Sequence, residues 1–375
     1  MDTAGLTGDL LTILLLRKIK KENKPKRNRR WWVRPINQDR EKKGDFRRLI
    51  NEMRLYDAEW FFTYTRMTPT LFESLLNMVG PHLTKNSIRK ALHPSQRLAI
   101  TLRFLSTGDS YFSIANGYHL GKSTVCTVIQ EVLEVLWQVL QPIVMPEPTK
   151  EKLQEIDIVL LGVCDADYNF TFVDIGAYAS IGDGGVFAQS VFGRNLTNGS
   201  IPLPSSKELP GTTIKLNHFF VGDAAFPLRE NLMRPYAGRK LNVVKSVFNY
   251  RLARARRIIE NTFGIMVARW RIYFRTICAA PPTAINIVKA TTCLHNFIRM
   301  SGPAKERYCP SNYIDSDDFL GKWRQEVEGS ILETCSRLGT NNASFGANTM
   351  RNNLAKYFLT RAGFKKGQIE YVKRT

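Results

Sequence analysis

The sequence predicts an all-α domain followed by a domain of the α/β (α+β) class. Residues 50–145 place apolar side chains at helical spacing, and from Ile158 the pattern changes to the continuous and alternating apolar runs of β-strands. Two long helical patterns follow the strands, and this order is typical of a mixed domain. A chain of 375 residues with 43% hydrophobic content is long enough for about two domains.

The first 49 residues are predicted to be a basic, disordered arm. Residues 17–48 hold 15 basic and four acidic side chains, a net charge of +11 within a chain of net charge +21. This excess favours nucleic acid as partner, and an acidic membrane surface second. The segment "KPKRNRR" is typical of a nuclear-import signal and of a phosphate-binding arm, and the alternative is a solubilising tail; its candidate DNA-binding residues are Lys26, Arg27, Arg29 and Arg30.

Residues 50–145 are predicted to form a helical domain with a helix-turn-helix. The segment "SQRLAITLRFLSTG" predicts a helix capped by Ser95, and "SYFSIAN" predicts a short helix. The segment "GYHLG" then predicts a turn, after which a longer helix is expected to be capped by Ser123. The alternative is an ordinary packing unit of three helices. If the pair binds DNA, the contacts come from the exposed start of the longer helix, at Lys122, Ser123, Thr124 and Thr127.

The second domain, residues 157–300, follows a proline-containing linker over residues 146–156. The runs "IVLLGVC" and "FTFVDIG" predict two strands of a hairpin, with "DADYN" as its turn. The run "HFFVGDA" predicts a further strand, and "NYRLARARRIIENTFGIMVARW" and "AINIVKATTCLHNFIRM" predict two helices. Residues 301–375 are predicted to be a polar tail with one helix near "MRNNLAKYF".

Two carboxylates of the second domain are candidates for catalysis and metal binding. Asp223 follows an apolar strand at the end where α/β sheets bind ligands, and Glu260 borders the apolar stripe of the long helix. Carboxylates of this kind can hold Mg²⁺ or Mn²⁺ for phosphodiester hydrolysis. The alternatives are a turn carboxylate for Asp223 and a surface ion pair with Arg256 for Glu260.

Four consecutive segments resemble the PIF/Harbinger transposases and the nucleases derived from them. They are "VLLGVCDADYNFTFVDIGAYASIGDGGVFAQS", "FFVGDAAFPLRENLMRPY", "FNYRLARARRIIENTFGIMVARWRI" and "ATTCLHNFIR". The resemblance covers about residues 50–300 and implies an RNase H-like fold with a DDE triad that binds divalent metal, an N-terminal helix-turn-helix, DNA as substrate and a nuclear location. It places the second triad Asp at Asp223 and the Glu at Glu260, and it implies a Myb-like protein as a partner.

The sequence departs from that family at the first triad Asp. The family's "IDG(T/K)H" block on the first strand is absent, because "EKLQEI" runs directly into "DIVLLGV". The RNase H-like domain is therefore expected to be incomplete, without its first strand, and its remaining strands to pair directly or expose their edges. The nearest substitute carboxylates along the chain are Asp157 and Asp165. Loss of one of three metal ligands predicts weak or absent nuclease activity.

The sequence thus predicts a nuclear, and also cytoplasmic, transposase-derived protein of metal-dependent endonuclease type. Two alternatives are a non-catalytic DNA-binding protein that recruits a partner, and an unstable truncated isoform. No run is long and apolar enough to cross a bilayer, so no membrane partner is expected. The sequence leaves the DNA site and the oligomeric state open.

Overall fold

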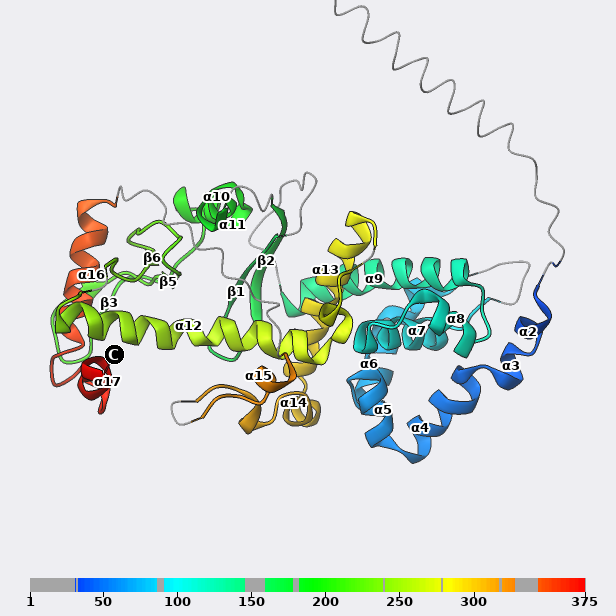
Figure 1. Cartoon of the computed structure of the whole chain (residues 1–375). Coiled ribbons are helices and arrows are strands. Elements are labelled where there is room, and N and C mark those ends of the chain that lie inside the picture. The colour runs from blue at the N-terminus through cyan, green and yellow to red at the C-terminus, as the bar shows by residue number, and fades with distance from the viewer. Residues whose placement is uncertain are drawn as a thin grey trace, which may run out of the picture.

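The structure is a computed structural model, drawn in Figure 1. It describes residues 31, 33–85, 91–145, 159–177, 182–238, 240–277, 279–316, 319–327 and 343–374. The candidate arm residues Lys26, Arg27, Arg29 and Arg30, the linker at 146–156 and Asp157 lie outside these ranges.

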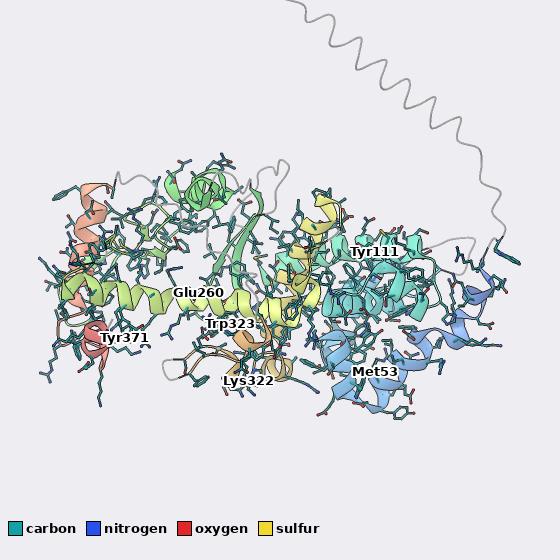
Figure 2. The ribbon with its side chains drawn as sticks, in the orientation of Figure 1. Met53, Tyr111, Glu260, Lys322, Trp323 and Tyr371 are labelled. Atoms are coloured by element: carbon teal, nitrogen blue, oxygen red, sulfur yellow. The ribbon has the colours of Figure 1, made fainter. Side chains whose placement is uncertain are left out.

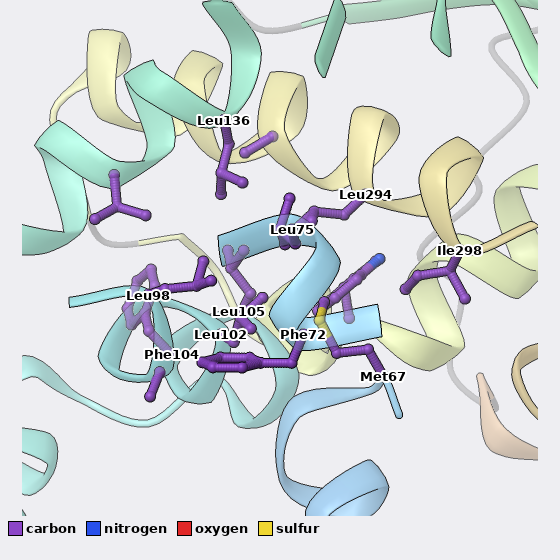
Figure 3. Close-up of a cluster of buried hydrophobic side chains, with 14 of the residues drawn as sticks. Met67, Phe72, Leu75, Leu98, Leu102, Phe104, Leu105, Leu136, Leu294 and Ile298 are labelled. Carbon is purple, nitrogen blue, oxygen red and sulfur yellow. The ribbon is translucent and has the colours of Figure 1, made fainter. Parts of the chain in front are cut away.

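Helices fill the N-terminal part of the described chain, on the right in Figure 1. Figure 3 shows their core, where buried leucines and aromatic rings of α6, α7 and α9 meet α13. The elements are α2 (Pro35–Gln38), α3 (Arg40–Lys43), a π-helical turn (Phe46–Ile50), α4 (Asn51–Tyr56), α5 (Ala58–Thr65), α6 (Pro69–Leu83), α7 (Pro94–Thr107), α8 (Tyr111–Gly117) and α9 (Lys122–Val144).

The prediction of a disordered arm is wrong for residues 33–49, which form short helices. Gly44 lies so close to the Tyr118 carbonyl that a Cβ would approach its oxygen to 3.0 Å. Ile50, the residue that follows this segment, is 1% exposed. A short apolar anchor and a close backbone approach therefore order a segment whose charge alone predicts disorder.

Two expected helix caps are also wrong, each by two residues. His93, not Ser95, caps α7, because its side chain accepts a hydrogen bond from the backbone N–H of Ser95. Pro94 then occupies the first helical position, where a backbone N–H has no partner within the helix, so proline loses no hydrogen bond there. Helix α9 begins at Lys122 with Gly121 as its N-cap, so Ser123 lies in the first turn.

Helix α9 meets the length and composition of a membrane-crossing helix, which the sequence analysis did not anticipate. Its valine and leucine stripe is buried against α7 and α13. Buried core helices of soluble proteins also meet these two criteria.

The described strands form three separate two-stranded sheets. The predicted hairpin is confirmed, since β1 (Val159–Cys164) pairs antiparallel with β2 (Phe170–Ala177). The predicted strand before Asp223 is confirmed but short: β5 (Phe220–Val221) pairs in parallel with β6 (Leu232–Met233). The third sheet is β3 (Lys207–Glu208) with β4 (Lys215–Leu216). Within the described residues β1 and β5 share no common neighbour, so each sheet keeps unpaired edges.

Helix α12 (Val243–Arg269) runs the length of the second part (Figure 1) and contacts β1, β5 and the later helices α13, α15, α16 and α17. Short helices α10 (Gly182–Gln189) and α11 (Val191–Thr197) lie on the same side of α12 as β1 and β2. The predicted second helix is α13 (Pro281–Arg299), which packs along α9. The two parts of the chain therefore share one hydrophobic core.

The C-terminal segment is not a polar tail with one helix. The predicted helix is present as α16 (Phe345–Tyr357) and packs on α12 together with α17 (Gln368–Arg374). Helices α14 (Gly302–Tyr308) and α15 (Trp323–Glu326) also belong to this segment. Trp323 is 4% exposed and Tyr308 fully buried, so a few large aromatic side chains fix a segment of polar composition.

Candidate active site

Asp223 lies in the loop that follows β5. Its Oδ1 accepts a hydrogen bond of 2.6 Å from the backbone N–H of Ala225, which closes a turn. Arg234, which is 6% exposed, donates to the backbone carbonyls of Ala224 and Phe226 at 3.3 and 3.0 Å. A buried guanidinium therefore holds the loop from behind and leaves the Asp223 side chain 26% exposed.

Glu260 lies near the middle of α12, where Figure 2 labels it. Apolar residues recur along the helix at three- and four-residue spacing, and among them Ile265 is buried. Glu260 falls at the border of that face, and its side chain remains 41% exposed. The sequence prediction of its position on the helix is confirmed.

Asp223 and Glu260 converge on one arginine. The Nη2 of Arg256, one turn before Glu260, lies 3.4 Å from Oδ2 of Asp223 and 3.7 Å from Oε1 of Glu260. Each partly exposed pair contributes only about 0.5 kcal/mol to stability. The geometry nevertheless brings the two predicted carboxylates to one point, with a positive charge between them.

A second arginine, which the sequence analysis did not single out, lies on the other side of Glu260. The Nη2 of Arg324, on α15, is 3.7 Å from Oε2 of Glu260. Arg324 also forms a bidentate pair with Asp315, whose side chain is fully buried, with N–O distances of 2.6 to 3.0 Å. These hydrogen bonds raise the pKa of the Arg324 guanidinium above its usual value. Positive and negative side chains thus alternate from Asp223 to Asp315.

The residues after Glu260 hold this second arginine in place. The Oδ1 of Asn261, which is 1% exposed, accepts from the backbone N–H of Asp315 at 3.1 Å and from the Trp323 indole at 2.7 Å. The Trp323 ring lies against Gly264, where a Cβ would come within 2.3 Å of it. The spacing of Glu, Asn and Gly in "ENTFG" therefore suits the docking of α15, a contact that the helical pattern alone does not predict.

Of the two proposed substitute carboxylates, Asp165 does not complete this set. Asp165 is in the β1–β2 turn, where its Oδ1 accepts from the backbone N–H groups of Asp167 and Asn169 at 2.9 Å. Its Oδ2 accepts from the Asn169 side chain at 3.1 Å. Asp165 is thus a turn residue, and Asp157 is outside the described chain.

The described residues do not fit a pair of resident divalent ions. A two-metal site needs several oxygen ligands converging on each ion. Here two carboxylates converge with a guanidinium between them, and the described residues hold no group of three or more His, Cys, Asp or Glu side chains placed for a metal.

The four candidate DNA-binding residues of the helical part lie together at the start of α9. Lys122, Ser123, Thr124 and Thr127 are all exposed. A turn over residues 118–121 precedes them, with His119 in the left-handed region at φ 52°. Tyr118 anchors the turn, since its buried hydroxyl lies 3.2 Å from that of Tyr64. The four side chains thus form a polar patch at one helix end.

Comparison with known proteins gives two matches and one negative result. Residues 151–296 match the family described as DDE superfamily endonuclease. "Protein ALP1-like" of Arabidopsis thaliana is 23% identical over 268 residues, which covers 58% of this chain and 64% of that protein. No solved structure was found to match the chain.

Proposed function

We propose that the chain is a nuclear, DNA-binding, transposase-derived protein with an impaired nuclease site. It carries a DDE superfamily endonuclease domain of Harbinger type over residues 151–296. The domain is the nuclease part of an RNase H-like fold that lacks its first strand. The chain spans 64% of the length of the ALP1-like relative, so activity, substrate and partners are part of the proposal.

The pairing of Arg256 with both Asp223 and Glu260 supports an impaired site. DDE superfamily endonucleases generally depend on divalent metal, which supplies an activated water and stabilises the leaving oxygen. In this chain a guanidinium at 3.4 and 3.7 Å offsets part of the negative charge of the two carboxylates. With the "IDG(T/K)H" block absent, the remaining donors bind Mg²⁺ or Mn²⁺ weakly.

DNA binding is supported by charge and by the patch at the start of α9. A net charge of +21 attracts a polyanion, and Lys122 with the hydroxyls of Thr124 and Thr127 offers phosphate and base contacts at a helix N-terminus. In this proposal α8 and α9 form the helix-turn-helix. Residues 1–49 direct nuclear import and add affinity for DNA without sequence preference. A Myb-like protein is the proposed partner.

Cleavage and binding measured on the same preparation test the proposal. We expect the full chain to bind duplex DNA with a steep salt dependence, and to cut it no faster in Mg²⁺ or Mn²⁺ than Asp223→Asn does. Metal-dependent cleavage that disappears in Asp223→Asn would show that another group fills the place of the first Asp. A wild-type chain that binds no DNA at low salt would overturn the DNA-binding function.

A second candidate function is a non-catalytic DNA-binding protein that recruits a partner. The observation that favours it is the series of alternating charges from Asp223 through Arg324 to Asp315, which joins the loop after β5, α12 and α15 through ion pairs. In that case Asp223→Asn leaves every DNA-dependent activity of the protein unchanged. The unstable-isoform alternative is tested by whether the purified chain unfolds cooperatively.

A further inference from the structure

A cavity of about 810 Å³ lies beside the loop that holds Asp223. Its walls come from the end of α11 and residues 201–206, from Asn217 and His218, and from residues 227–231. The volume is in the range of pockets that hold small molecules. Pro227 belongs both to this wall and to the loop after β5, so the cavity borders the candidate active site.

The cavity contains an arginine, Arg229, whose side chain makes no hydrogen bond or ion pair with other described residues. The Nε of Arg229 is buried and has no hydrogen-bond partner there. Its backbone is fixed, since its N–H donates to the Leu232 carbonyl at 2.9 Å and its carbonyl accepts from the Leu232 N–H at 3.2 Å. Arg229 lines the cavity, and the terminal N–H groups of a guanidinium form a fork of donors that fits a bidentate oxyanion.

The neighbouring acidic residue does not neutralise Arg229. The carboxylate of Glu230 lies against the first turn of α16, where a Cβ on Gly346 would come within 2.1 Å of its Oε1. Carboxylates are stabilised at such helix starts. The wall also contains exposed His218 and Asn217, which offer donors beside the guanidinium.

The cavity lies a short distance along the strand from Asp223. The N–H of Phe220 in β5 donates to the carbonyl of Asn231, which lines the cavity, at 2.9 Å. From Phe220 to Asp223 the chain advances three residues, about 10 Å if extended. The cavity is therefore within reach of a strand that passes Asp223.

We propose that this cavity binds a short single-stranded stretch of DNA, with Arg229 on a phosphate and His218 beside the nucleotide. The proposal rests on the proposed DNA-binding function and specifies where one strand lies next to the Asp223–Glu260 site. A concave site of this size takes part of one strand and excludes a duplex.

The test compares Arg229→Gln with Arg194→Gln in the full chain. Arg194, on neighbouring α11, is exposed and donates to the Gln189 carbonyl at 2.7 Å, so its loss changes the net charge equally. Affinity for a short fluorescein-labelled single strand is measured by anisotropy over a range of salt concentrations. Arg229→Gln is expected to weaken binding about 10-fold and to lower the salt slope by about 0.7, while Arg194→Gln changes little.

Thermal unfolding separates binding from folding. Because the Arg229 side chain makes no bond with other described residues, and its backbone bonds remain in the variant, Arg229→Gln is expected to keep the wild-type melting temperature. Inorganic phosphate is expected to stabilise the wild type but not the variant. Equal weakening by both variants, or an unchanged single-strand affinity in Arg229→Gln, would overturn the cavity proposal while duplex binding stands. A wild-type chain that binds neither form of DNA would overturn the proposed function and this inference together.

Discussion

His295 is a buried histidine that is expected to lower the stability of the protein in mild acid. It lies on α13 and is 0% exposed. Its Nε2 donates to the carbonyl of Tyr168 in the β1–β2 turn at 2.9 Å, and its Nδ1 lies 3.0 Å from the Tyr308 hydroxyl. Burial lowers its pKa from 6.5 to about 3, and the nearby charge of Arg299 acts in the same direction. The neutral ring thus connects the hairpin turn to α13 and α14.

The sign and size of the effect follow from this lowered pKa. The unfolded chain takes up a proton near pH 6.5, while the folded chain does not until about pH 3. The stabilisation by neutral His295 is therefore fully present above pH 6.5 and is lost as the pH falls toward 3. At pH 5 the loss is about 2 kcal/mol, from a difference of 1.5 pH units at 1.36 kcal/mol each.

The assay is the free energy of unfolding by urea at pH 7.5 and at pH 5, for the wild type and His295→Gln. Glutamine keeps a donor for the Tyr168 carbonyl but does not titrate. We expect the wild type to lose about 2 kcal/mol more than the variant between the two pH values. His82→Gln, which changes an exposed histidine, is the control and is expected to follow the wild type. The same pH dependence in the wild type and in His295→Gln would refute the reasoning.

Four further expectations concern packing and DNA. Gly264→Ala is expected to destabilise the fold by about 2 kcal/mol in urea unfolding, because its methyl would strike the Trp323 ring, whereas Gly302→Ala meets no atom within 4 Å and stays near the wild type. Asn296→Ala removes three hydrogen bonds to buried backbone groups, which predicts a loss of about 3 kcal/mol in the same assay. Deleting residues 17–48 is expected to lower the salt slope of DNA binding equally on all sequences, and an unchanged slope would exclude a role for this segment. A variant with alanine at Lys122, Thr124 and Thr127, at the start of α9, is expected to weaken binding to a preferred site more than binding to random DNA. Equal losses on both would favour an ordinary helix-packing unit over a helix-turn-helix.

The sequence by itself determined the local elements and the candidate carboxylates. Apolar spacing of 3.6 residues predicted α7, α9, α12 and α13, and the alternating run after "DADYN" predicted the β1–β2 hairpin. These predictions hold because each depends on a periodic face over many residues. Asp223 and Glu260 were found from a strand end and a helix border, and the family resemblance placed them in one site.

Only the tertiary structure decided what surrounds those carboxylates. Arg256 was visible as a neighbour of Glu260 on one helix, but its contact with Asp223 joins residues 33 positions apart. Arg324 and Asp315 come from the C-terminal segment, whose polar composition predicted a tail. Arg324 reaches Glu260 because Asn261 and Gly264 dock Trp323. Local periodicity contains no information about such contacts, since they depend on which distant surfaces fit together. The shared core of α9 and α13, and the ordering of residues 33–49 against Tyr118, follow from the same cause.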